Sequence, residues 1–210
     1  MTLPPGTDLF ALMGVAIAVC AAWARLCLAM AGQCRWLGWS AGLVFALLWV
    51  PVGAASLPIV AYVRGITSDL SVTLVAICAL GLWQRLAGRT VEAGREQAAV
   101  SAFVAVAALI LYPTALGWGD WDAYRLGWGS ASLWGVLALV CLFAWMKDLR
   151  RLPVLVALAL LAWTFGWMES NNLWDYLLDP WLAVACLVSS VRIGFGRLAR
   201  LVRRERPHSV

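Results

Sequence analysis

Charged side chains, histidines and catalytic motifs are all scarce in this sequence. Charged residues make up 13% of the 210 positions and hydrophobic ones 63%, whereas soluble domains are about half apolar and about a quarter charged. A soluble core cannot enclose that many apolar side chains, so we expect most of the surface to face lipid. The only histidine is His208, and no HExxH or P-loop motif occurs, which argues against the common zinc-protease and haem-binding sites.

Thiol chemistry is not indicated either. None of the six cysteines falls in a predicted outer loop, and there is no CxxC pair. Cys20, Cys27 and Cys34 repeat every seven residues on one helical stripe, but small polarizable side chains suit helix contacts, and no neighbouring histidine supports metal binding. We therefore predict no disulfide, no metal and no cofactor.

Seven apolar segments approach the length needed to cross a bilayer. A helix rises about 1.5 Å per residue, so a hydrocarbon layer of roughly 30 Å takes about 20 residues. We predict an all-α fold, a polytopic integral membrane helical bundle of about seven transmembrane helices. The segments are Leu9 to Ala31, Trp36 to Tyr62, Leu70 to Arg85, Ala98 to Leu116, Ala131 to Met146, Pro153 to Met168 and Trp181 to Phe195.

Basic residues sort to one side of these segments. If the segments alternate in direction, 14 of the 16 Lys and Arg residues fall on one face and 7 of the 11 acidic residues on the other. Because Lys and Arg near the ends of the spans set the orientation, we predict the N-terminus outside and the C-terminus in the cytoplasm. No ionisable residue falls at mid-depth, which argues against a proton pump or a carrier of charged substrates.

Two prolines, Pro51 and Pro58, interrupt the second segment. Proline lacks a backbone N–H and clashes with the preceding turn, so we expect this helix to kink or break near its outer end, and we favour the kink. The next helix is expected to be capped by Ser68 or Asp69.

The chain is predicted to form one domain. Residues 1–196 make a single transmembrane helical bundle, and residues 197–210 make a basic cytoplasmic tail that continues the last helix along the anionic inner leaflet. Met1 to Asp8 contains no Lys or Arg, so the first segment is not expected to be a cleaved signal peptide. Arg outnumbers Lys 15 to 1, a hint of a GC-rich bacterial genome, so we predict the bacterial inner (plasma) membrane as the location.

Tryptophan is frequent, with 14 residues. Indole rings prefer the headgroup layer, so we expect two aromatic belts. The predicted outer belt contains Trp118, Trp121, Trp128, Trp134, Trp167, Trp174 and Trp181, and the inner one contains Trp36, Trp39, Trp83 and Trp145.

The outer loop from Gly117 to Gly129 has a Gly-Trp-Gly triplet at each end. We expect these glycines to bracket a defined turn that carries Asp120, Asp122 and Arg125. Asp120 and Asp122 also make the DxD pattern that glycosyltransferases use to hold a divalent metal. Such a short pattern often arises by chance, and no nucleotide-binding domain accompanies it, so no metal is assigned.

The densest polar group lies between Glu169 and Pro180. The apolar residues of this segment have helical spacing, which predicts a short amphipathic helix in the membrane interface. Asp179 followed by Pro180 is typical of an N-cap and a first helical position, so a structural role is expected for Asp179.

The candidate residues come from three outer loops. The ligand-binding candidates are Arg64, Asp120, Asp122, Arg125, Asn171 and Asn172, and the catalytic candidates are Glu169 and Asp175. Two carboxylates at a partly desolvated surface can differ in pKa and so divide acid and base work, while amides can bind hydroxyl or phosphate oxygens. The alternative is a solvated loop whose acids pair with Arg64 or Arg125.

Three functions fit this pattern. The leading hypothesis is a non-catalytic binding or accessory subunit in envelope or lipid-linked assembly, with an outward polar, Trp-rich patch for a lipid-linked substrate or an envelope protein partner. The first alternative is an integral-membrane transferase or hydrolase acting on a lipid headgroup, with Glu169 or Asp175 as base and Arg64 or Arg125 holding phosphate. The second is a small-solute transporter with a cavity at the break between Pro51 and Pro58. Membrane lipids are expected partners and nucleic acid is not.

Overall fold

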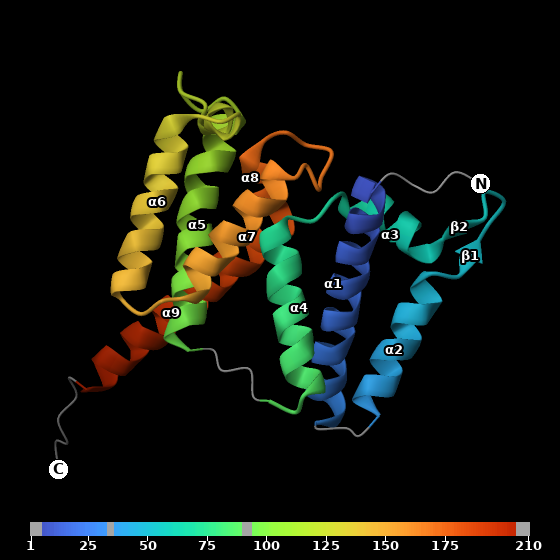
Figure 1. Cartoon of the computed structure of the whole chain (residues 1–210). Helices are drawn as coiled ribbons and strands as arrows, with labels where there is room; N and C mark the ends of the chain where they lie inside the picture. The colour runs from blue at the N-terminus through green and yellow to red at the C-terminus, as the bar shows by residue number, and fades with distance from the viewer. Residues whose placement is uncertain (1–5, 33–35, 90–93, 205–210) are drawn as a thin grey trace, which may run out of the picture. The chain divides into compact units, whose positions relative to one another are not determined.

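The computed structural model describes residues 6–32, 36–89 and 94–204, and side chains as far as residue 196. This part of the chain is all-helical apart from one short hairpin (Figure 1). Its α-helices are α1 (Gly6–Ala31), α2 (Leu37–Leu48), α3 (Ile59–Thr67), α4 (Val72–Leu86), α5 (Arg95–Ala115), α6 (Ala131–Met146), α7 (Arg151–Thr164), α8 (Leu173–Leu177) and α9 (Pro180–Arg204). A 3-10 helix, η1 (Ala123–Gly127), precedes α6, and the strands β1 (Pro51–Val52) and β2 (Leu57–Pro58) form the hairpin.

The chain that we predicted to form one domain divides into two compact units. The first contains residues 1–92 and 155–179, and the second contains residues 93–154 and 180–210. In the first unit α1 packs against α2, α3 and α4, and α8 packs against α4. In the second unit α5 packs against α9 and η1, and η1 contacts α6. The predicted continuation of the last helix into the basic tail is confirmed as far as Arg204, and residues 205–210 lie outside the described residues.

Each predicted apolar segment contains a helix, and α6 has the predicted bounds, Ala131–Met146. Within the described ranges, two helices, α1 and α5, are long and apolar enough to cross a membrane by length and composition. The helices α2, α4, α6 and α7 and the apolar part of α9, Pro180–Gly196, have 10–17 residues each. The structure therefore supports an all-helical fold with two membrane-capable helices.

In the second segment the helix breaks, which is the alternative to the kink that we favoured. After α2 the chain forms the hairpin, with Pro51 opposite Pro58 and Val52 opposite Leu57, and then starts α3 in a new direction. Neither proline can donate a hydrogen bond to a continuing helix, and Gly53 between them has φ 72°. A backbone hydrogen bond from Ile59 N to Val50 O, 3.2 Å, closes the base of the hairpin. Two prolines and a left-handed glycine within eight residues disrupt more hydrogen bonds than a bent helix can tolerate.

The cap expected for the next helix is also different. Helix α4 begins after Ser71, whose Oγ accepts a hydrogen bond from Leu74 N at 3.1 Å. Ser68 instead ends α3 with φ 59°, and Asp69 pairs with Arg64. The helix therefore starts later than the sequence indicated, because Asp69 has a stronger, charged partner in the preceding helix.

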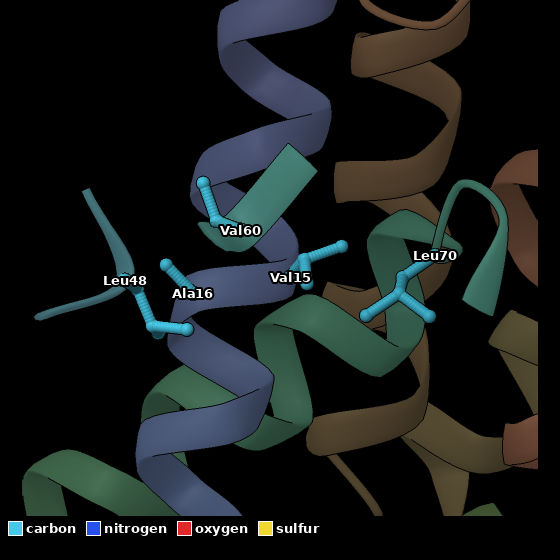
Figure 2. Close-up of a cluster of buried hydrophobic side chains, with 5 residues drawn as sticks. All are labelled: Val15, Ala16, Leu48, Val60 and Leu70. Atoms are coloured by element: carbon cyan, nitrogen blue, oxygen red, sulfur yellow. The ribbon is translucent and has the colours of Figure 1, made fainter. Parts of the chain in front are cut away.

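The core of the first unit centres on Val15 and Ala16 of α1. Leu48 at the end of α2, Val60 in α3 and Leu70 before α4 pack around them (Figure 2). Val60 and Ala16 are fully buried. Since one cluster holds α2, α3 and α4 against α1, it fixes the end of the unit at which α3 and the start of α4 lie.

In the second unit α5 and α9 lie side by side and run in opposite directions (Figure 1). Glu96, near the start of α5, contacts the start of α7 within the same unit. Its carboxylate oxygens accept backbone hydrogen bonds from Arg150 N at 3.2 Å and Arg151 N at 2.7 Å. A carboxylate at the exposed N–H groups of a helix start satisfies donors that the helix itself leaves free. Glu96 is therefore a cap supplied from another helix.

Large apolar side chains are exposed along helix faces of the second unit. On α6 they include Val136, Leu139 and Phe143, and on α9 they include Val184, Val188 and Val191. Their spacing of three to four residues places each set on one face of its helix. Contiguous apolar faces of this extent are typical of surfaces that meet lipid or other apolar partners.

Candidate functional site

The most connected polar group in the first unit is built around Arg64. Its Nε donates to Asp69 Oδ1 at 2.6 Å and its Nη2 to Asp69 Oδ2 at 3.2 Å, so this pair is bidentate. Its Nη1 donates to Asp8 Oδ1 at 2.7 Å, and Nη2 also reaches Glu169 Oε1 at 3.4 Å. These four residues, Arg64, Asp8, Asp69 and Glu169, are called the Arg64 cluster below. The cluster joins the start of α1, the end of α3 and the loop before α8.

The local sequence explains how the cluster forms. Thr67 and Ser68 end α3, and the positive φ of Ser68, 59°, reverses the chain so that Asp69 returns to the arginine five residues before it. The hydrogen bond to Asp69 is the main cause that raises the pKa of Arg64 above its ordinary value, and the bond to Asp8 adds to it. Arg64 is therefore a permanent cation whose charge is already shared among carboxylates.

The charge balance of the Arg64 cluster is negative, because three carboxylates surround one guanidinium. Asp8 and Asp69 are mostly shielded, whereas the side chain of Glu169 is 65% exposed. An incoming phosphate would have to displace a carboxylate from Arg64, and the remaining acids would repel it. The arrangement is thus suited to holding chain segments together.

The loop before α8 uses its polar side chains to order its own backbone. Asn172, a ligand candidate, is fully buried and caps α8, with its Oδ1 accepting from Trp174 N at 3.0 Å. Ser170 donates to the carboxylate of Asp175, a catalytic candidate, and accepts from Asn172 N. The side chain of Asn171 is exposed, and its carbonyl oxygen accepts from the Trp163 indole at 2.8 Å. Asn172 and Asp175 are thus engaged within the loop itself.

The short helix predicted in this loop is confirmed as α8, but its apolar residues face protein. Leu173, Trp174, Tyr176 and Leu177 are buried. Trp174 therefore does not belong to the exposed belt in which we placed it, whereas ten other tryptophans of the two predicted belts are exposed: Trp118, Trp121, Trp128, Trp134, Trp167, Trp181, Trp36, Trp39, Trp83 and Trp145. Helical spacing alone could not tell a lipid-facing stripe from a protein-facing one.

Tyr176 in α8 was not among the site candidates, although its side chain makes several contacts. Its hydroxyl accepts from Met168 N at 3.2 Å and contacts the carbonyl oxygens of Met168 and Ser170 at 3.2 and 3.0 Å. Burial is the main cause that raises the pKa of this phenol above its usual value. The Tyr176 side chain therefore holds the loop that carries Glu169.

Two hydrogen bonds attach this loop to the start of α4. The Asp179 carboxylate accepts from Ser71 N at 2.9 Å, and Thr73 Oγ1 donates to Tyr176 O at 3.4 Å. Asp179 and Ser71 are both buried, and Pro180 begins α9 as predicted. The structural role expected for Asp179 is thus matched by a bond to a residue 108 positions away, which the sequence did not indicate.

The remaining candidates lie in the second unit, on the loop around η1. Asp122 caps η1 by accepting from Tyr124 N at 2.9 Å. Asp120 and Arg125 are exposed, and neither takes part in an ion pair within the described residues. Gly117, Gly119 and Gly129 bracket the loop with φ near 90°, the left-handed region that favours glycine.

Among residues 6–32, 36–89 and 94–204, no group of three or more His, Cys, Asp or Glu side chains could hold a metal ion. Of the sequence candidates, Arg64 and Glu169 are brought into contact, and Asn171, Asn172 and Asp175 share the loop beside them. No protein-family model, curated protein or solved structure matches the chain.

Proposed function

We propose that this chain is a multi-pass protein of the bacterial inner membrane that acts as a non-catalytic binding or accessory subunit in envelope or lipid-linked assembly. Its seven apolar segments cross the membrane, with the N-terminus outside and the C-terminus in the cytoplasm. The short helices α2, α4, α6 and α7 reach the full thickness with their flanking turns and a locally thinner bilayer. The exposed apolar helix faces meet lipid.

The distribution of charge within the first unit supports this topology. All of its described carboxylates, Asp8, Asp69, Glu169, Asp175 and Asp179, belong to the start of α1, the loop before α4 or the loop around α8. The described arginines other than Arg64 lie toward the ends of α1 and α4: Arg25, Arg85 and Arg89. An excess of arginine at the cytoplasmic ends is what the positive-inside rule requires.

Some polar residues of the predicted outer loops are engaged in contacts within the fold, and others are exposed. This difference supports a binding role for the loop that carries the exposed ones. Arg64, Glu169, Asn172 and Asp175 are engaged with other residues of the first unit. On the loop 117–129, Asp120 and Arg125 are exposed beside the exposed indoles of Trp118 and Trp121. Free charges of both signs next to aromatic rings can bind a partner that carries polar and apolar groups.

We therefore place the outward binding surface on the loop 117–129, with Asp120, Arg125 and Trp121 as its contact residues. The observation that carries this assignment is the exposure of Asp120 and Arg125 without an ion-pair partner in the described residues. Since Glu169 and Asp175 hold the fold, we expect no catalysis by them. The enzymatic alternative would need both carboxylates to be released from their present contacts.

The test is native mass spectrometry of gently extracted full-length protein. We expect wild type to retain a lipid-linked molecule or an envelope protein, and the triple variant D120N/R125Q/W121A to lose it. The matched control K147Q, at the end of α6, is expected to retain it. Retention of nothing by wild type, or equal retention by the triple variant, would contradict the proposal. Changed membrane lipid profiles in E169Q or D175N cells would favour the enzyme instead.

A further inference from the structure

Two arginines of the first unit lie at the same level on neighbouring helices. Helices α1 and α4 pack together and run in the same direction (Figure 1). They are in close contact at Gly14, where an added Cβ would lie 2.9 Å from Val75 Cγ2. Arg25 follows Gly14 by eleven residues and Arg85 follows Val75 by ten. Because each helix rises about 1.5 Å per residue and the two run in the same direction, Arg25 and Arg85 lie at nearly the same distance along the helix axes from the Gly14–Val75 contact.

The electrostatic interactions agree with this register. The positive charge of Arg25 acts against that of Arg85, and both arginines act electrostatically on the Cys78 thiol of α4. Arginine stays protonated in proteins, so the repulsion is present at every pH. The pair is therefore a fixed site of two positive charges.

The side chain of Arg85 lies back along its own helix. A Cβ at position 81 would come within 2.7 Å of Arg85 Nη1 and 3.8 Å of Cζ, so the guanidinium rests on Gly81. The arginine thus lies over the preceding turn of α4, on the side away from the helix end, and it is half-buried. Gly81 is the residue that leaves room for it.

No described carboxylate neutralises the pair. The ion pairs of the described residues involve neither Arg25 nor Arg85. Asp179 acts on Cys78 electrostatically, but its carboxylate accepts the hydrogen bond from Ser71 N. Arg85 is half-buried and Arg25 is exposed. Two neighbouring guanidiniums are stabilised most by an anion that accepts hydrogen bonds from both.

We propose that Arg25 and Arg85 together bind one phosphate group. Guanidinium forks match the geometry of phosphate oxygens, and two forks can each take a pair of oxygens. If the topology proposed above holds, the pair lies at the cytoplasmic ends of α1 and α4, where basic pockets between helices bind anionic lipid headgroups. Phosphate recognition by the two arginines does not depend on that topology or on the outward loop. The phosphate group could come from a lipid headgroup or from a free phosphate ion.

The test uses the full chain in a neutral detergent and measures binding from the rise in melting temperature as ligand is added. The probes are phosphatidylglycerol in mixed micelles, diacylglycerol as a phosphate-free lipid, and inorganic phosphate. The variants are R25Q and R85Q. The matched control is R89Q, which removes one positive charge from the same end of the unit. Arg89 is not expected to bind the phosphate, because its guanidinium already lies over the Trp83 ring, 4.8 Å from the ring centroid.

We expect phosphatidylglycerol to bind wild type and R89Q saturably, and to bind R25Q and R85Q about tenfold or more weakly, because each loses a charged hydrogen-bond donor. Diacylglycerol should give no rise. Binding of inorganic phosphate at least as tight, lost in the same two variants, would support the site with the free ion as its ligand. Equal weakening in all three variants, or none in R25Q and R85Q, would overturn the proposal.

Folding of the variants provides a second measurement. Without anion, R85Q should melt at the same temperature as wild type or higher, because it relieves the repulsion from Arg25. A variant that cannot be purified folded would contradict this expectation. R25K and R85K, which keep the charge and lose the planar fork, should then show an intermediate loss of phosphatidylglycerol binding.

Discussion

The guanidinium of Arg64 in α3 donates to the Asp8 carboxylate in α1 at 2.7 Å, although 56 positions separate the two residues. Together with the bidentate bond to Asp69, this contact fixes the beginning of α1 to the end of α3. Arg64 is one of two basic residues predicted on the outer side, and it is surrounded by acids. The exception to the charge sorting therefore has a local structural reason.

The three carboxylates of the Arg64 cluster should differ in their contribution to stability. Asp69→Asn is expected to lower the free energy of unfolding by roughly 2 kcal/mol, because it removes a charged, bidentate and mostly shielded partner. Glu169→Gln should cost less than about 1 kcal/mol, since its side chain is 65% exposed and its contact is 3.4 Å long. Asp8→Asn should lie between them. Thermal melts of the three variants in detergent measure the order, and an equal effect of all three would contradict the geometry described above.

The bond between Asp179 and Ser71 should stabilise the attachment of the α8 loop to α4. Asp179→Ala leaves the buried Ser71 N–H without its acceptor, which costs about 1–3 kcal/mol. Asp179→Asn keeps one acceptor oxygen and should cost less. The exposed Asp120 provides the control, and Asp120→Ala is expected to melt like wild type. If Asp179→Ala also melted like wild type, the loop would be held by other contacts.

Two adjacent leucines of α2 provide a matched test of the core. Leu48 is 6% exposed and packs into the cluster around Val15 and Ala16, whereas Leu47 is 50% exposed. Leu48→Ala should lower stability by about 2–5 kcal/mol, as large-to-small substitutions in cores do. Leu47→Ala should lower it far less. Equal losses would mean that the Leu47 side chain is buried by a partner or by ordered lipid.

The phenol of Tyr176 should make stability fall at alkaline pH. Its pKa is raised on folding, mainly by burial, so its contribution is fully present below the pKa of an unfolded tyrosine, about 10, and is lost as the pH rises further. At pH 7 Tyr176→Phe should be less stable by about 1–2 kcal/mol, because the hydroxyl loses its partners Met168 and Ser170.

The difference between Tyr176→Phe and wild type is therefore expected to narrow between pH 9 and 11, and melting temperatures across this range measure it. Comparing the two proteins cancels the effect of the other tyrosines. If the difference in melting temperature between wild type and Tyr176→Phe instead grew with pH, the folded state would favour the ionised phenol.

Local patterns were sufficient to predict several of the helices. Apolar length placed α6 at its observed bounds, and the Asp179–Pro180 pair marked the start of α9. These predictions succeeded because hydrophobic runs and proline geometry act within a few residues. The break after α2 was underestimated, since the combined effect of Pro51, Gly53 and Pro58 exceeds that of one proline in a helix.

The polar contacts were less predictable. Asp8, Ser71 and Tyr176 were not among the site candidates, although each makes a contact that orders an outer loop or a helix end. These contacts join residues that the fold brings together, so no spacing in the sequence indicates them. Asp8 did have one local signal, as the only charged residue at the start of the first apolar segment.

The orientation of the chain is the claim on which the outward loop depends, and reporter insertions into the full-length protein test it most directly. Alkaline phosphatase inserted after Tyr124 or after Asp175 should be active, and green fluorescent protein inserted after Arg89 or after Asp148 should fluoresce. Fluorescence at positions 124 and 175 with phosphatase activity at positions 89 and 148 would place the loop 117–129 in the cytoplasm and contradict the proposed function.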